Sequence, residues 1–171
     1  MSRAVADAIE SVARPAVEPV ASSFTSSSVR VRIPIANDAD VATAGEQGRR
    51  LASRLDFSPT DITVIATAIL EVARNVLTYA QRGDLMLHLI QRRGRLGLAV
   101  VARDKGPGIP DVAQALRDGK GLGLASVRRL MDEFRVRSEP GRGTTVTMRK
   151  WTRCRQVERA GARRLAVRDV R

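Results

Sequence analysis

The chain of 171 residues is poor in cysteine and histidine, with one residue of each, Cys154 and His88. A single cysteine excludes an intramolecular disulfide and a metal cluster built on cysteines. His88 lies inside an alternating segment with no second histidine or cysteine near it, so we expect it to be structural or exposed. A reducing cytoplasm is the simplest compartment for such a chain.

Aromatic residues and long apolar runs are also scarce. Aromatics make up 3% of the chain, too few for the interleaved base-stacking platforms of single-strand nucleic-acid binders. Acidic residues, Asp7, Glu10 and Glu18, interrupt the apolar N-terminal residues. No window approaches the roughly 20 apolar residues of a membrane span. We therefore expect a soluble, cytoplasmic protein with no membrane partner.

Positive charge is abundant and unevenly distributed, with a formal net charge of +12. Residues 1–28 have a net charge of −1, residues 29–150 of +8 and residues 151–171 of +5. Such a balance favours acidic partners, phosphate ligands or non-specific nucleic acid, and the scarcity of aromatics argues against nucleic acid. We expect a flexible extension over 1–28, one domain over 29–151 and a disordered basic tail over 152–171.

Hydrophobic periodicity predicts the order of helices and strands. An alternating strand at 29–35 contains Pro34, which favours an edge position. The remaining expected elements are helices at 38–55 and 58–79, strands at 84–92 and 95–103, short and longer helices at 111–117 and 122–134, and strands at 135–139 and 144–151. Hairpins interspersed with helices predict an α/β two-layer sandwich, with a mixed, largely antiparallel sheet and helices on one face.

The segment "EVARN" places Glu71 and Asn75 four residues apart, on one face of the second helix. The pair can be an ordinary solvated helix face. However, Asn is a poor helix former, and an amide oxygen beside a carboxylate suits a hard cation such as Mg²⁺.

The segment "DKGPGIP" follows the strand at 95–103. It can be a simple turn, since Asp-x-Gly and Pro-Gly are common turn sequences. Alternatively, Asp104 can accept a hydrogen bond from an exocyclic amine, while Gly106 and Gly108 let the backbone approach a ligand.

The segment "GKGLGL", residues 119–124, places three glycines before a helix. Glycine backbone at a helix N-terminus is suited to anions, and Lys120 can add a positive charge beside a phosphate. Its spacing matches neither a Walker loop nor a Rossmann fingerprint.

The ordered combination of "EVARN", "DKGPGIP", "GKGLGL" and "GRGTTV" resembles the GHKL family of ATP-binding domains, which share the Bergerat fold. "RRLMDEFRVRSEPGRGTTVTMRKW" and "ARNVLTYA" are similar to the RsbT-type switch serine kinases. The resemblance covers residues 29–151. One departure is a short lid, since "RDGKGLGL" lacks the additional small residues that such kinases usually have there.

The resemblance assigns roles to individual residues. It implies that Asn75 binds Mg²⁺, that Glu71 polarises the attacking hydroxyl, and that Asp104 pairs with the adenine amino group. The other residues implied in binding ATP, together with Lys120, are Gly106, Gly108, Gly121, Gly123, Leu124 and Thr144.

The resemblance also implies an activity and partners. A kinase of this type uses ATP and Mg²⁺ to phosphorylate a STAS-domain antagonist, RsbS- or RsbR-like, and when released activates a PP2C-type, RsbU-like phosphatase. Two alternatives remain open. One is an anti-sigma factor kinase that holds a sigma factor, and the other is a non-catalytic partner-binding module, which the short lid favours.

Overall fold

The structure is a computed structural model that describes residues 29–92, 94–117 and 123–153. The expected extension 1–28 and nearly all of the expected basic tail lie outside these ranges. Lys120 and Gly121 of the glycine-rich segment lie outside them as well.

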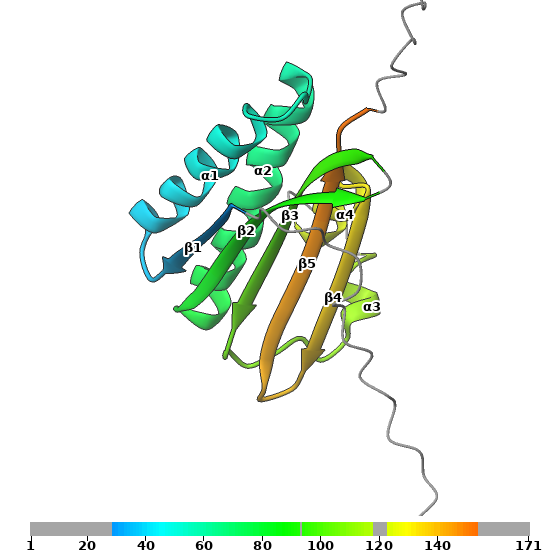
Figure 1. Cartoon of the computed structure of the whole chain (residues 1–171). Coiled ribbons are helices and arrows are strands. Elements are labelled where there is room, and N and C mark those ends of the chain that lie inside the picture. Colours follow the sequence, from blue (N-terminus) through cyan, green and yellow to red (C-terminus); the bar gives the residue numbers. More distant parts are fainter. Residues whose placement is uncertain (1–28, 93, 118–122, 154–171) are drawn as a thin grey trace, which may run out of the picture.

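The sheet has five strands in the order β1-β2-β3-β5-β4, and every described pair is antiparallel (Figure 1). The strands are β1 (Arg30–Ile35), β2 (Gly83–Arg92), β3 (Arg95–Asp104), β4 (Glu133–Glu139) and β5 (Gly143–Trp151). The expected largely antiparallel sheet is confirmed. Pro34 lies on the edge strand β1, where a residue without a backbone N–H disrupts the sheet least.

The helices cover one face of this sheet (Figure 1). They are α1 (Asp38–Ala52), α2 (Pro59–Asn75), α3 (Val112–Ala115) and α4 (Leu124–Leu130), and a π-helical turn η1 (Val76–Ala80) continues α2. The side chains of Asn37 and Ser58 cap α1 and α2 by accepting from the N–H groups of Asp40 and Asp61. The expected two-layer arrangement is therefore present.

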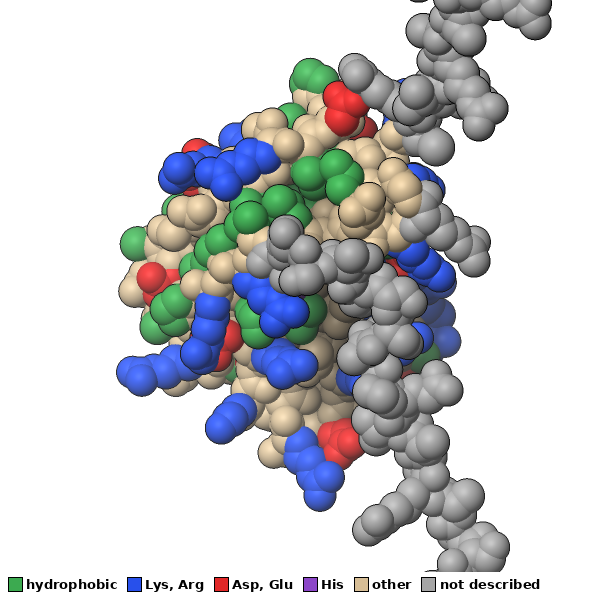
Figure 2. Space-filling view, viewed as in Figure 1, with side chains coloured by type: hydrophobic (Ala, Val, Ile, Leu, Met, Phe, Trp, Pro, Cys, Tyr) green, Lys and Arg blue, Asp and Glu red, His purple; other side chains and the backbone are tan. Residues whose placement is uncertain are grey.

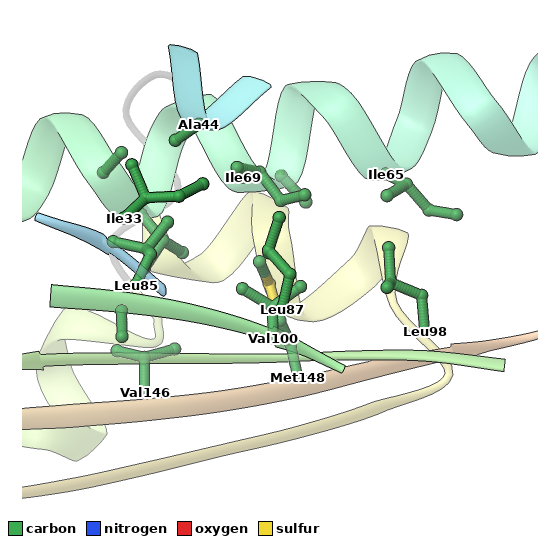
Figure 3. Close-up of a cluster of buried hydrophobic side chains, with 14 of the residues drawn as sticks. Ile33, Ala44, Ile65, Ile69, Leu85, Leu87, Leu98, Val100, Val146 and Met148 are labelled. Carbon is green, nitrogen blue, oxygen red and sulfur yellow. The ribbon is translucent and has the colours of Figure 1, made fainter. Parts of the chain in front are cut away.

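A single core fills the space between α2 and the sheet. Figure 3 shows Ile65 and Ile69 of α2 directed toward strand residues that include Leu87 and Val100. All four of these side chains are fully buried. Alternate strand residues supply this core, so the other residues of each strand lie on the uncovered side of the sheet, called the open face below.

The predicted end of the helix at 122–134 is wrong. α4 ends at Leu130, and β4 begins at Glu133. Met131 already has an extended backbone, and Phe134 pairs with Met148 in the sheet. Phe134 is half-buried against the core, and an apolar residue at this position fits a strand or a helix equally well, so its apolar character does not separate the two.

Two further observations differ from expectation. The helical stretch Pro59–Ala80 is long and apolar enough to cross a membrane by length and composition. Its buried stripe packs on the sheet, as the core helix of a soluble domain does.

Thr152, expected in the tail, is buried and donates its N–H to the carbonyl of Leu96 at 2.9 Å, so the folded domain extends past Trp151.

Candidate functional site

Glu71 and Asn75 lie in the last turns of α2, one helical turn apart, and both are half-buried. The neighbouring positions Val72 and Ala73 are buried in the core, which fixes the rotation of the helix. Asn75 directly precedes η1, which ends at Ala80, and the next residue, Gln81, has a left-handed backbone with φ 62°.

Asp104 ends β3 with a half-buried side chain on the helix-covered side of the sheet. Its Oδ1 accepts hydrogen bonds from the N–H of Gly106 at 2.8 Å and from the N–H of Thr144 at 3.2 Å. Among the described residues Oδ2 has no hydrogen-bond partner. The carboxylate is therefore held in place through one oxygen and offers the other to a donor.

Gly106 joins this carboxylate to the helix that carries Asn75. A Cβ at Gly106 would lie 2.6 Å from the Cβ of Ala80 and 3.1 Å from Asp104 Oδ1. Because Ala80 is the last residue of η1, the loop after β3 packs directly on the turn that follows Asn75. Only glycine permits this close approach.

Gly108 joins the same loop to the turn between β4 and β5. It has φ +74°, and a Cβ there would lie 2.2 Å from the carbonyl oxygen of Glu139. Two hydrogen bonds accompany the contact: Gly141 N–H donates to Pro107 at 2.7 Å, and Ile109 N–H donates to Ser138 Oγ at 2.7 Å. The loop after β3 is thus held on two sides, by η1 at Gly106 and by the end of β4 and the β4–β5 turn at Pro107, Gly108 and Ile109.

Ser138 connects the loop to Thr144. Its Oγ donates to the carbonyl of Gly143 at 3.0 Å and lies 2.9 Å from Thr144 Oγ1. A cavity of about 600 Å³ is lined by residues that include Val112, Ser138 and Thr144. It shares Thr144 with the site but extends toward the edge strand β4, away from Glu71 and Asn75.

The structure thus brings together most of the residues singled out in the sequence. Asp104, Gly106 and Thr144 are in direct contact, and Gly108 lies two residues farther along the same loop. Asn75 is connected to this group along the chain, since it directly precedes η1, whose last residue, Ala80, packs against Gly106. Glu71 lies one helical turn before Asn75. Gly123 is the N-cap of α4 and Leu124 its first residue, both half-buried.

No group of three or more His, Cys, Asp or Glu side chains suited to a metal is found among the described residues. Mg²⁺ is commonly held by one or two protein groups together with phosphate oxygens and water. Glu71 and Asn75, one helical turn apart on α2, carry side-chain oxygens of the kind that Mg²⁺ prefers.

Ser138 and Ala80 are the site residues that the sequence analysis missed. Ser138 contacts Ile109 across 29 positions of the chain, and Ala80 supports Gly106 across 26. Neither contact leaves a local signal, because serine in a strand and alanine in a helix are ordinary. Only the register of β4 against β5 would have revealed Ser138 opposite Thr144.

Comparison with known proteins gives consistent matches. Residues 35–150 match the family described as histidine kinase-like ATPase domain. The chain is 40% identical over 127 residues to the serine/threonine-protein kinase RsbT of Bacillus subtilis (strain 168), which covers 71% of this chain and 96% of that protein. It is 30% identical over 111 residues to the anti-sigma F factor of Geobacillus stearothermophilus, which covers 57% of this chain and 75% of that protein.

A solved structure matches more distantly. The histidine kinase domain of the blue-light activated histidine kinase from Erythrobacter litoralis EL346 has a TM-score of 0.43 and 21% identity. The match covers 66% of this chain and 59% of that one.

Proposed function

Since the chain belongs to the family of histidine kinase-like ATPase domains, we propose that it is a protein serine/threonine kinase that binds ATP at the Asp104–Thr144 site. The observation that carries this proposal is the half-buried Asp104 carboxylate, anchored through Oδ1 with Oδ2 available. The loop that directly follows Asp104 packs on the turn after Asn75.

The donor and acceptor pattern fits an adenine ring. An exocyclic amine is a hydrogen-bond donor, and Asp104 Oδ2 is an acceptor without a partner among the described residues. The Oδ1 bonds fix the carboxylate before a ligand arrives, so little side-chain entropy is lost on binding. Gly106 leaves the backbone beside it without a side chain.

The proposed ligand also carries phosphates and a divalent cation. When bound, ATP supplies the phosphoryl group and Mg²⁺ neutralises its charge. Asn75 would bind the cation through its amide oxygen, and Gly123 at the start of α4 would face the phosphates with Lys120 and Gly121. Glu71 would orient the substrate hydroxyl and accept its proton.

The proposal also concerns the proteins with which the kinase interacts. The match to RsbT extends over 96% of that protein and supports a role in partner switching. We expect a STAS-domain antagonist as the phosphorylated protein, a PP2C-type phosphatase as the protein activated on release, and the cytoplasm as the compartment. An anti-sigma factor kinase is the second candidate, favoured by the 30% identity to anti-sigma F factors.

The first test measures ATP binding and phosphoryl transfer separately. Purified chain with ATP and Mg²⁺ should phosphorylate a serine or threonine of a candidate STAS partner. Asn75→Ala should weaken ATP·Mg²⁺ binding and transfer together. Glu71→Gln should lower transfer by at least about 10²-fold, with nucleotide binding nearly unchanged, because a general base acts in the chemical step.

Glu46→Gln is the matched control, since Glu46 is an exposed glutamate on α1. It should leave both measurements unchanged. ATP binding with no transfer to any candidate partner would overturn the kinase assignment and leave a binding module. Capture of a sigma factor in place of a phosphatase would select the anti-sigma factor.

A further inference from the structure

The open face of the sheet presents three rows of side chains that the helices do not cover. The pairing register aligns residues directly across all five strands. The first row is Pro34, Asp84, Arg103, Thr145 and Arg137. The second is Arg32, Met86, Val101, Thr147 and Arg135, and the third is Arg30, His88, Ala99, Arg149 and Glu133.

These rows hold six arginines against two carboxylates, so the face is strongly positive. Asp84 neutralises Arg32 at 2.9 Å, and Glu133 neutralises Arg149 at 2.5 Å. The other four arginines are exposed and form no ion pair within the described residues. They are Arg30 on β1, Arg103 on β3, and Arg135 and Arg137 on β4.

A hollow with an apolar floor lies between these charges. Half-buried Met86 and Val101 pair in the middle row, and a cavity of about 420 Å³ opens over them. Charged side chains, including Arg32 and Arg103, complete its lining. Figure 2 views this side of the sheet and shows hydrophobic side chains between separate groups of Lys and Arg.

We propose that the open face is a docking surface for an acidic segment of another protein. One apolar side chain of the partner occupies the hollow over Met86 and Val101, and flanking Asp or Glu side chains meet Arg103, Arg135 and Arg137. Arginine favours such contacts because its planar guanidinium binds carboxylates through two parallel hydrogen bonds.

Charge and shape favour this occupant over two others. A second copy of the chain would bring a second excess of arginines against the first, which like-charge repulsion disfavours. A nucleic acid would place phosphates beside Asp84 and Glu133 and would leave the apolar floor unused. An acidic segment with one apolar side chain can pair its carboxylates with the exposed arginines and place the apolar side chain over Met86 and Val101.

This surface is separate from the ATP site. Strand alternation places Thr144 on the helix-covered side and its neighbour Thr145 on the open face. The docking proposal therefore does not depend on the kinase assignment, and the two can fail independently.

The test is fluorescence anisotropy with the full chain and a labelled peptide that has one leucine between two runs of three glutamates. The wild-type chain should bind it, and Arg103→Glu with Arg137→Glu should weaken binding by about tenfold or more, since two attractive contacts become repulsive. The matched control is Arg50→Glu with Arg54→Glu, two exposed arginines outside the sheet. It should change the Kd by less than about twofold, because Arg50 lies on α1 and Arg54 follows that helix, outside the sheet that forms the open face, and salt screens charges at a distance.

Several results would overturn the proposal. Equal weakening in the control pair would indicate general charge attraction. Tighter binding of a DNA duplex, lost in the Arg103/Arg137 variant, would identify a nucleic-acid surface. A dimer in sedimentation that this variant dissociates would identify an interface between copies.

The thermal midpoint and the ATP affinity of the Arg103/Arg137 variant serve as controls. If both are unchanged, the fold and the nucleotide site of the variant are intact, and any loss of peptide binding comes from the open face.

Discussion

The two side-chain oxygens of Asp104 differ in their hydrogen bonds, and the substitution Asp104→Asn can separate their proposed roles. Oδ1 accepts from Gly106 and Thr144 and holds the loop against β5, whereas Oδ2 has no partner among the described residues. In Asp104→Asn, the amide oxygen can keep the Oδ1 bonds. The amide nitrogen then replaces Oδ2 with a donor.

We predict that Asp104→Asn weakens ATP binding by about 2–3 kcal/mol, since a donor then faces the donor of the adenine amine and a charged acceptor is lost. The thermal midpoint without nucleotide should change little. Isothermal titration with ATP measures the first effect and thermal unfolding the second. Asp84→Asn, a comparable change on the neighbouring strand but on the open face, is the control and should leave ATP affinity intact.

At the scale of elements, the loop between β3 and α3 is held by its contact with the β4–β5 turn. Gly108 provides this contact, with a positive φ and no room for a Cβ beside Glu139. Gly141, in the opposing turn, has nearly the same φ, +76°, but open space where a Cβ would lie. The two glycines therefore separate backbone strain from steric clash.

We predict that Gly141→Ala costs about 1 kcal/mol of folding free energy, from backbone strain alone. Gly108→Ala should cost about 2–4 kcal/mol, because the clash with the Glu139 carbonyl adds to the strain and displaces the loop. It should also weaken ATP binding, which Gly141→Ala should not. Urea unfolding and nucleotide titration on both variants measure these differences. Equal costs would show that the contact with Glu139 is easily relieved.

The sequence predicted elements well where one periodicity dominated. The apolar stripe of α2 and the alternation of β1 have clear periods, and both elements are present. The end of α4 was missed because Met131 and Phe134 also fit helical spacing. In the candidate site, Asp104 and Gly106 stand close together in one sequence motif, and the structure shows a hydrogen bond between them. Ser138 was missed because its contacts depend on strand register, which local sequence does not encode.

At the scale of the whole molecule, two titrating groups on the open face make folding sensitive to acid. Burial lowers the pKa of His88 from its ordinary value of 6.5, and the charge of Arg30 lowers it further. For Glu133, burial acts to raise the pKa, but hydrogen bonds from Arg149 and Trp151 and the charges of Arg149 and Arg92 lower it overall from 4.5. In both cases the unfolded chain takes up a proton at a higher pH than the folded chain.

We predict that the free energy of unfolding falls as the pH drops below about 6.5, because protonation of His88 in the unfolded chain favours unfolding. It falls again below about 4.5 as Glu133 contributes. His88→Gln should remove the first decrease and keep the second. Urea unfolding between pH 7 and pH 4 measures both. A decrease near pH 6 that persists in His88→Gln would contradict the role given to His88.

Strand β5 has a further consequence for how the chain must fold. Its Thr144 faces Asp104 on one side of the sheet, while Thr145 and Thr147 lie between the arginines on the other. A slip of one residue would exchange these faces and disable both surfaces at once. Gly143 opposes such a slip. A slip by one residue would place Arg142 or Thr144 where Gly143 now lies, but that position has φ +83°, and a Cβ there would be 2.2 Å from the Asp104 carbonyl oxygen. A misfolded chain with shifted β5 would therefore lose the proposed nucleotide site and the proposed docking surface together, and we expect both kinds of binding to recover in parallel during refolding.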